Sequence, residues 1–334
     1  MIVSRTPYRI SLFGGGTDFP GWYHEHGGAV IGTTINKYCY LSVRRLPPFF
    51  EHKHRIVYSK IELPSHVNEI QHPSVRAVLQ NHWAEGGLEV HHQGDLPARS
   101  GLGSSSSFTV GLLHAIRALR GAISGAEWLA DEAIRIEQDV IGESVGSQDQ
   151  VWAAYGGTNI IKFEVGGQVN VQPLIISKKQ EHDLNDHLLL FFTGFSRYAV
   201  DIESEKMARL KSLDPHLLKL HGLVHDAAKI IQGHEGVITD LGEMLRESWE
   251  VKKQLSSGVT TDAIDDIYAQ GINAGALGGK LLGAGGGGFM LFFAPPEAHD
   301  NIKARLNKLI NVDINIGSSG SKIVVYEPNG LERV

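Results

Sequence analysis

Residues 97–108 read PARSGLGSSSSF and lie between a predicted strand, residues 88–92, and a predicted helix, residues 104–119. Gly101 and Gly103 carry no side chain that would block a ligand from approaching the backbone. Four serines then open the helix, where unpaired N–H groups and the helix dipole favour an anion. The segment lacks the Lys-Ser/Thr pair that closes a Walker A loop. It therefore predicts a phosphate site of another kind, and a flexible turn that caps an ordinary helix is the alternative.

The first glycine segment in chain order, residues 13–18, reads FGGGTD and follows a strand-like run that contains Ile10 and Leu12, so residues 97–108 are the second. Three consecutive glycines indicate backbone packed closely against a neighbour. Thr17 and Asp18 offer a hydroxyl and a carboxylate, which suit the hydroxyl groups of a sugar. A plain turn with an Asp cap explains the same residues equally well.

The third glycine segment, residues 278–288, reads GGKLLGAGGGG and leads into a strand predicted at 289–294. It contains a formal G-x-G-x-x-G. A dinucleotide-binding fingerprint needs a strand, the loop and then a helix, whereas this loop leads into a strand. We therefore reject the dinucleotide interpretation.

Composition excludes several classes of protein. The chain has 31 Lys and Arg against 37 Asp and Glu, a net charge of −6, which gives no electrostatic reason to expect nucleic acid as a partner. Its only cysteine, Cys39, precludes a disulfide framework and is expected to be a buried structural thiol. Arg5 and Arg9 interrupt any signal peptide, and the strongest apolar run, residues 289–294, is too short to span a bilayer. We expect a soluble cytoplasmic protein with no membrane partner.

Both halves of the chain mix strands and helices without strict alternation, which favours an α+β fold. A polar stretch, residues 177–186, is the candidate boundary, so that we predict domains at 1–180 and 187–334. Further strands are predicted at 38–44, 158–165, 187–193 and 321–326, and further helices at 73–84, 124–140, 198–213, 215–232, 236–256, 260–274 and 296–310.

Three motifs in a fixed order, RTPYRISLFGGGTD, PARSGLGSSSS and KLLGAGGGGFML, resemble those of the GHMP kinase superfamily. That superfamily includes galactokinase, homoserine kinase, mevalonate kinase and phosphomevalonate kinase. The resemblance covers essentially the whole chain. It implies an N-terminal domain of the ribosomal-S5-domain-2-like type, a C-terminal ferredoxin-like domain, and an active site in the cleft between them.

Within the superfamily, FGGGTDFPGWYHEHGGAVIGTTINKYCY and RRLPPFFEHKHRIVYSKIE look like the bacterial D-glycero-D-manno-heptose 7-phosphate kinases. This resemblance implies ATP-dependent phosphorylation of the anomeric C1 hydroxyl, which gives the 1,7-bisphosphate for nucleotide-activated heptose synthesis. Galactokinases carry Gly-Glu-His-Thr-Asp where this chain has GGGTD at residues 14–18, so galactose is not the expected substrate. The second motif also has Ser106 and Ser107 where many members have alanine.

The resemblance assigns roles to individual residues. Asp149, within GSQDQ, matches the catalytic aspartate, and Arg9 matches the arginine beside the reacting hydroxyl. Ser105 and Glu137 match the Mg²⁺ ligands. ATP would lie on Pro97, Ser100, Gly101, Leu102, Gly103, Ser104, Ser105, Ser106 and Ser107, and the sugar on Gly15, Gly16, Thr17, Asp18, Gly285 and Gly286.

Asp149 would take the proton of the C1 hydroxyl, while Arg9 would stabilise the developing oxyanion and keep Asp149 ionised. Each residue also has an ordinary structural alternative. Asp149 could cap a loop, Arg9 could form a salt bridge, and Glu137 could lie on a solvated helix face.

A 7-phosphate on the sugar requires its own cationic pocket. We favour Arg197, which follows a predicted strand, because the planar guanidinium suits phosphate. Arg44, Arg45, Lys53 and Arg55 are the other candidates, and a solvated loop or a subunit contact explains them equally well. A 1-kinase of an unphosphorylated sugar such as fucose, and a sugar and ATP sensor without turnover, remain open alternatives, as does a homodimer.

Overall fold

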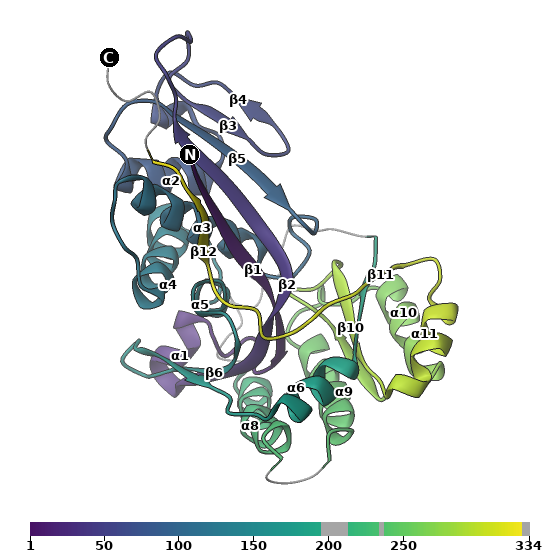
Figure 1. Cartoon of the computed structure of the whole chain (residues 1–334). Helices are drawn as coiled ribbons and strands as arrows, with labels where there is room; N and C mark the ends of the chain where they lie inside the picture. Colours follow the sequence, from purple (N-terminus) through teal and green to yellow (C-terminus); the bar gives the residue numbers. More distant parts are fainter. Residues whose placement is uncertain (195–212, 234–236, 329–334) are drawn as a thin grey trace.

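The computed structural model describes residues 1–194, 213–233 and 237–328, which form two β-sheets covered by helices (Figure 1). The larger sheet has the order β12-β1-β2-β5-β3-β4, with β6 paired to β2 and β7 paired to β6. Its strands are β1 (Ile2–Phe13), β2 (Gly28–Arg45), β3 (Arg55–Val57), β4 (Ile61–Glu62), β5 (Leu88–Gly94), β6 (Thr158–Phe163), β7 (Val169–Pro173) and β12 (Lys322–Tyr326).

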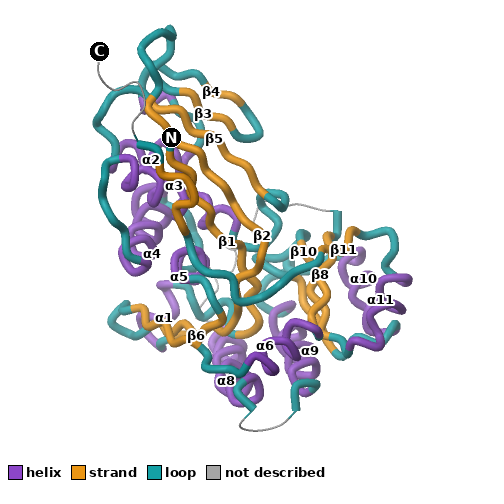
Figure 2. Tube along the Cα trace, in the orientation of Figure 1, coloured by secondary structure: helices purple, strands orange, loops and turns teal. Residues whose placement is uncertain are grey.

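Four helices gather beside one face of this sheet (Figure 2). They are α2 (Pro73–His82), α3 (Ser104–Leu119), α4 (Ala126–Arg135) and α5 (Gln148–Tyr155). The central helix α3 buries most of its residues against β1 and β2, because its apolar side chains recur at helical spacing. The short helix α1 (Pro20–His26) follows the turn after β1.

The smaller sheet has the order β11-β8-β10-β9 and is antiparallel throughout. Its strands are β8 (Leu188–Phe192), β9 (Gly278–Leu281), β10 (Phe289–Phe293) and β11 (Ile310–Val312), and the helices of this half are α6 (Lys178–Asp186), α8 (Asp214–Ile231), α9 (Asp240–Lys253), α10 (Asp262–Asn273) and α11 (His299–Arg305). Central β10 is buried along its whole length, as its run FMLFF indicates.

Most of the predicted elements are present with small shifts at their ends. Helix α3 has the predicted bounds, and β1 ends at Phe13, directly before the first glycine segment. The predicted helix 296–310 is shorter than expected: it consists of the 3₁₀ turn η4 (Pro296–Ala298) and α11, because the chain then pairs with β8 as β11. The helix predicted at 198–213 lies outside the described residues, apart from its last position.

The polar stretch at 177–186 is helix α6 and not an open linker. Ser177 Oγ accepts from the Gln180 backbone N–H at 3.2 Å, and Gln180 Oε1 accepts from the Ser177 N–H at 2.7 Å. This reciprocal capping box starts a helix in a segment whose composition indicated a boundary.

The final strand β12 lies beside β1 in the larger sheet, where Ile2 is opposite Tyr326 (Figure 1). The predicted segment 187–334 therefore contributes to both sheets. One continuous hydrophobic core likewise includes residues of β1, α3 and α8, so the two halves are packed together. The domain boundary at 180–187 stays a prediction, and β12 crosses that boundary to join the larger sheet.

The predicted helix 124–140 is interrupted near its end. Helix α4 runs from Ala126 to Arg135 and is followed by a π-helical turn, η2 (Ile136–Ile141). Such turns are uncommon and often mark functional positions. This one turns Glu137 into the interior, where it is 1% exposed.

Candidate active site

Arg9 and Asp149 form a two-point ion pair at the junction of β1 and α5. Arg9 Nε donates to Asp149 Oδ1 at 2.8 Å, and Nη2 donates to Oδ2 at 2.7 Å. The Arg9 side chain is 6% exposed and that of Asp149 is 25% exposed, so solvent and ligands can reach the carboxylate. Asp149 lies in the first turn of α5, where the helix dipole favours a negative charge. The two predicted catalytic residues are thus adjacent, although 140 positions separate them.

Arg9 also fixes the second glycine segment. Its Nη1 donates to the Gly101 carbonyl at 2.6 Å, and its backbone N–H donates to Leu102 O at 3.1 Å. Gly103 faces the ion pair, since a Cβ built there would lie 3.4 Å from Asp149 Oδ2. The strand of the first motif and the loop of the second are therefore held together by one arginine.

The third glycine segment packs directly on the second. A Cβ at Gly101 would come within 2.4 Å of Leu282 O, and a Cβ at Gly288 would come within 2.3 Å of Ser100 O. Real Cβ atoms do not approach so closely, so both positions require glycine. The three motifs, far apart in the sequence, thus meet around the Arg9–Asp149 pair.

The serines of the second segment have different surroundings. Ser100, Ser104 and Ser107 have protein partners: Ser100 Oγ donates to Pro97 O, Ser104 Oγ accepts from Arg99 N, and Ser107 Oγ donates to Pro7 O. Leu102 is buried in the core. Ser105 is exposed at the start of α3, whose N-cap residue Gly103 supplies no side-chain cap. The first-turn N–H groups at this helix start can therefore receive an anion.

Glu137 lies beneath this helix start. Its Oε2 accepts from Ser106 Oγ at 2.9 Å and from Gln150 Nε2 at 2.5 Å. Its Oε1 is buried, and the Thr109 hydroxyl, which also donates to Ser105 O at 3.3 Å, lies beside the Glu137 carboxyl. Burial raises the pKa of the Glu137 carboxyl to about 7.

A buried carboxylate one residue from exposed Ser105, through its partner Ser106, offers the oxygen ligands that Mg²⁺ prefers. Glu137 hydrogen-bonds Ser106 in this structure, and not Ser105, the serine predicted to be a Mg²⁺ ligand. Within the described ranges no cluster of three or more His, Cys, Asp or Glu could hold a metal ion alone. A cation here would therefore depend on nucleotide phosphates for further ligands. No role was predicted for Gln150, which directly follows Asp149 and donates to Glu137.

Asp18 is 2% exposed and lies beside the first glycine segment. Its Oδ1 accepts from the Gly16 N–H at 2.9 Å, and Gly146 packs against its carboxyl group. Burial raises the pKa of Asp18, and the nearby charge of Asp149 raises it further. The Asp18 and Asp149 carboxyl groups are therefore close enough to interact.

Thr17 is placed differently from the prediction. Its hydroxyl donates to Gly14 O at 2.8 Å and to Ala29 O at 2.9 Å, and it accepts from the Ala29 N–H at 3.1 Å. The side chain is completely buried, so the structure assigns Thr17 to the turn and not to a substrate. Gly285 and Gly286 similarly pack on the backbone of Val259, to which Gly286 N donates at 3.0 Å.

Two of the basic residues considered as phosphate ligands form ion pairs elsewhere on the larger sheet. Arg44 pairs with Glu89 at 2.5 Å and Arg45 with Glu85 at 2.7 Å. Arg44 is ten positions along β2 from Thr34, the partner of Arg9, which is roughly 33 Å at ~3.3 Å per residue. Arg44 and Arg45 therefore lie away from the Arg9–Asp149 pair. Arg197 lies outside the described residues.

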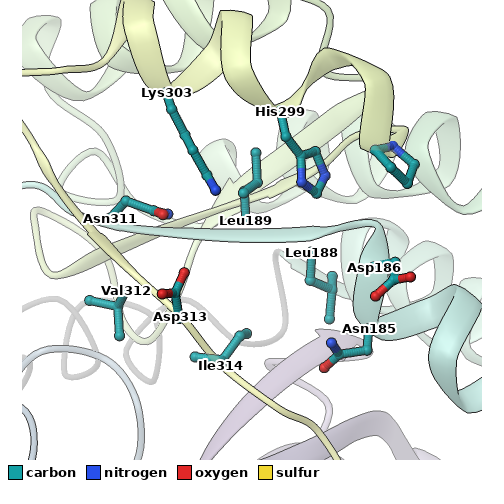
Figure 3. Close-up of a pocket in the computed structure, with 11 residues that line it drawn as sticks. Asn185, Asp186, Leu188, Leu189, His299, Lys303, Asn311, Val312, Asp313 and Ile314 are labelled. Atoms are coloured by element: carbon teal, nitrogen blue, oxygen red, sulfur yellow. The ribbon is translucent and has the colours of Figure 1, made fainter.

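A surface pocket of about 200 Å³ lies in the other half of the molecule (Figure 3). His299 and Lys303 of α11 face Asn311 and Asp313 across it. The described residues that we predicted as site residues do not line this pocket. The candidate active site is therefore the region around Arg9 and Asp149.

Two family descriptions match the chain: "GHMP kinases N terminal domain" over residues 70–157 and "GHMP kinases C terminal" over residues 227–311. The chain belongs to the GHMP kinases, a family of phosphotransferases that use ATP as the phosphate donor. The predicted two-domain α+β kinase fold is thereby confirmed. No helix in the described ranges is long and apolar enough to cross a membrane.

Among its relatives, the chain is 30% identical to D-glycero-alpha-D-manno-heptose 7-phosphate kinase of Campylobacter jejuni, over 92% of this chain and 93% of that protein. It is 25% identical to the bifunctional fucokinase/GDP-fucose pyrophosphorylase of Arabidopsis thaliana, over 93% of this chain and 31% of that protein. The fold also matches the crystal structure of a D-glycero-D-manno-heptose 1-phosphate kinase from Bacteroides thetaiotaomicron. The TM-score is 0.78 at 23% identity, over 96% of this chain and 98% of that one.

Proposed function

We propose that this protein is a sugar kinase that transfers the γ-phosphoryl group of ATP to the anomeric C1 hydroxyl of D-glycero-D-manno-heptose 7-phosphate. The observation that carries the proposal is the Arg9–Asp149 ion pair, which lies where three glycine segments meet. Both oxygens of Asp149 accept one hydrogen bond from Arg9, and each retains a further lone pair for a substrate hydroxyl.

In the proposed reaction Asp149 accepts the C1 hydroxyl proton while the C1 oxygen forms a bond to the γ-phosphorus. The bond from that phosphorus to the bridging oxygen of ADP breaks. Arg9 holds the carboxylate in position through two hydrogen bonds and places a positive charge beside the developing oxyanion. Because phosphoryl transfer depends mainly on positioning and charge stabilisation, one base and a phosphate cradle suffice.

The N-terminus of α3 and the backbone of residues 97–107 would bind the ATP phosphates. Glu137 and Ser105 would hold Mg²⁺, which neutralises phosphate charge when it is bound. Asp18 is suited to a sugar hydroxyl, because a buried acceptor with a raised pKa gains from a donor.

The relative from Campylobacter jejuni supports heptose 7-phosphate as the acceptor. The plant bifunctional fucokinase/GDP-fucose pyrophosphorylase, similar over 93% of this chain, supports a second candidate, a fucose 1-kinase. Arg197 separates the two proposals: Arg197→Ala should raise KM for the heptose phosphate and leave KM for a free sugar unchanged. An equal rise for both acceptors would count against a dedicated 7-phosphate pocket.

The decisive experiment is a panel of acceptors with ATP and Mg²⁺, in which phosphorus NMR identifies the phosphorylated position. The panel contains D-glycero-D-manno-heptose 7-phosphate, L-fucose, D-mannose, D-galactose and mevalonate. We expect the 1,7-bisphosphate from the heptose phosphate at the highest kcat/KM. Phosphorylation at any carbon other than C1 would overturn the assignment.

A further inference from the structure

Gly15 differs from its two glycine neighbours, because the folded chain itself does not require glycine there. Gly14 has a φ of +83° and a Cβ would lie 2.0 Å from Ala29 O, and Gly16 has a φ of +108°. Gly15 is not in the left-handed region. Among the described atoms, a Cβ at Gly15 would meet only Ser11 Oγ at 3.7 Å and Gln148 Nε2 at 3.9 Å, which are ordinary contact distances. Packing therefore leaves room for one more atom at this position.

Two buried polar side chains border the space over Gly15. Ser11 is 8% exposed and Gln148 is 9% exposed. Ser11 Oγ and Gln148 Oε1 are shielded from solvent and lack a hydrogen-bond partner in the ranges the structure covers. The Gln148 amide donates to the Asp18 carboxyl, which leaves its oxygen as an acceptor. A buried acceptor without a donor costs folding free energy. A ligand whose hydroxyl groups donate hydrogen bonds would therefore stabilise this arrangement.

These two residues are neighbours of the reacting pair on the same two elements. Ser11 follows Arg9 by two positions on β1, so both side chains lie on one face of the strand. Gln148 directly precedes Asp149 at the start of α5. The elements that place Arg9 beside Asp149 therefore also place Ser11 near Gln148. Ser11 lies about 6–7 Å from Arg9 along the strand. That step is comparable with the spacing between hydroxyl groups across a sugar ring.

We propose that Ser11 and Gln148 form a hydroxyl-binding subsite over Gly15, which orients a polyol acceptor for reaction at Asp149. Gln148 Oε1 accepts a hydrogen bond from one sugar hydroxyl, Ser11 Oγ forms a hydrogen bond with a second, and Gly15 keeps the space open. The inference rests on the proposed sugar kinase function and adds the residues that select the acceptor. Asp18, which the Gln148 amide contacts, completes a set rich in acceptors.

Three variants test the subsite with D-glycero-D-manno-heptose 7-phosphate as the probe. Gln148→Met removes the acceptor at similar length, Ser11→Ala removes the hydroxyl, and Gly15→Ala fills the space. Gln148→Met and Ser11→Ala should each raise KM for the sugar about tenfold, the effect of one lost hydrogen bond to a substrate. Gly15→Ala should raise KM for the sugar because its Cβ occupies the space over residue 15, and KM for ATP should stay unchanged in all three variants. Gly15→Ala should keep the unfolding temperature of the wild type.

Gly222→Ala is the matched control, since Gly222 is an exposed residue of α8 and a Cβ there meets nothing described within 4 Å. It should have wild-type kinetics. Monodeoxy sugar analogues provide a second measurement that a merely structural role would not reproduce. The analogue that lacks the hydroxyl bound by Gln148 should have a raised KM with the wild type. Gln148→Met should not raise KM for that analogue any further.

Wild-type sugar kinetics in Gly15→Ala, or an equal rise in KM for ATP and for sugar in Gln148→Met, would refute the subsite. The wild-type enzyme reports on the proposed function separately. If it phosphorylates a sugar other than the heptose phosphate, the same variants and ratios test the subsite with that sugar. If it phosphorylates only mevalonate, the polyol subsite and the sugar kinase proposal both fail.

Discussion

Arg9 donates to both carboxylate oxygens of Asp149 and, through its remaining nitrogen, to the carbonyl of Gly101. One guanidinium therefore positions the proposed base and the proposed phosphate loop at the same time. Bidentate arginine–carboxylate pairs define both distance and angle, so the relative placement of these groups depends on a planar fork.

Asp149→Asn should lower kcat by about 10²–10⁴-fold, the usual contribution of a general base, because an amide cannot take the proton. Arg9→Lys should lower kcat less, since it keeps the charge and loses the fork. A coupled assay of ADP release measures both variants, and thermal unfolding checks that they fold. Wild-type turnover in Asp149→Asn would exclude Asp149 as the base.

Glu137 should make stability depend on pH. Its pKa is near 7 in the folded protein and 4.5 is its ordinary value, so the folded state holds the proton more tightly. The stabilisation is fully present below pH 4.5 and is lost as pH rises to about 7, up to about 3 kcal/mol in total. Urea unfolding of the metal-free protein from pH 4.5 to 8 should show this fall, and Glu137→Gln should remove it.

Mg²⁺ provides an independent check on the same residue. A metal competes with the proton for the Glu137 carboxylate, so Mg²⁺ added to the ATP-bound wild type should stabilise it more at pH 8 than at pH 6, relative to ATP alone. The same stabilisation in Glu137→Gln would show that the metal binds elsewhere.

Gly101 should be intolerant of alanine. Its φ is +84° and a Cβ would lie 2.4 Å from Leu282 O, whereas Gly121 has a φ of +75° and no described atom within 4 Å of its Cβ position. Both substitutions impose left-handed strain, and only Gly101→Ala also separates two glycine segments. Gly101→Ala should lower the free energy of unfolding by about 1–3 kcal/mol more than Gly121→Ala does, and it should raise KM for ATP. An equal loss of unfolding free energy in the two variants, measured with urea, would contradict the close packing of these segments.

Arg99 has a φ of 58°, and no other non-glycine residue in the described ranges has a positive φ. Arg99→Gly should be more stable to urea than Arg99→Val by about 1–2 kcal/mol, because the left-handed conformation is costly for side chains and most costly for β-branched ones. Arg99→Ala controls for the loss of the side chain. Equal stability of the glycine and valine variants would mean that the loop can leave this conformation.

The sequence was sufficient to predict which distant residues lie together wherever a motif carried its own geometry. Arg9 and Asp149 were expected together, and they form an ion pair. Glycine patterns also located the three segments. What the glycines do was harder to predict: Gly101, Gly283 and Gly288 pack backbone on backbone, so much of the glycine excess serves contact between segments as well as ligand access.

Residues whose partners come from distant segments were assigned less well. Thr17 was predicted to contact the sugar, but its hydroxyl bonds the backbone of Gly14 and Ala29. The π-helical turn that buries Glu137 leaves no signature in hydrophobic spacing. Only tertiary structure shows that Glu137 contacts Ser106 and Gln150.

The pairing of β12 with β1 has a consequence for biosynthesis. Ile2 pairs with Tyr326, and Thr6 shares a hydrogen bond with Ser321. β12 can therefore pair with β1 in the larger sheet only after more than 300 further residues have left the ribosome. Until then the outer backbone groups of β1 remain open to other strands. Such long-range closure slows folding and prolongs exposure to aggregation. The first half of this enzyme therefore cannot complete its fold during translation without the second.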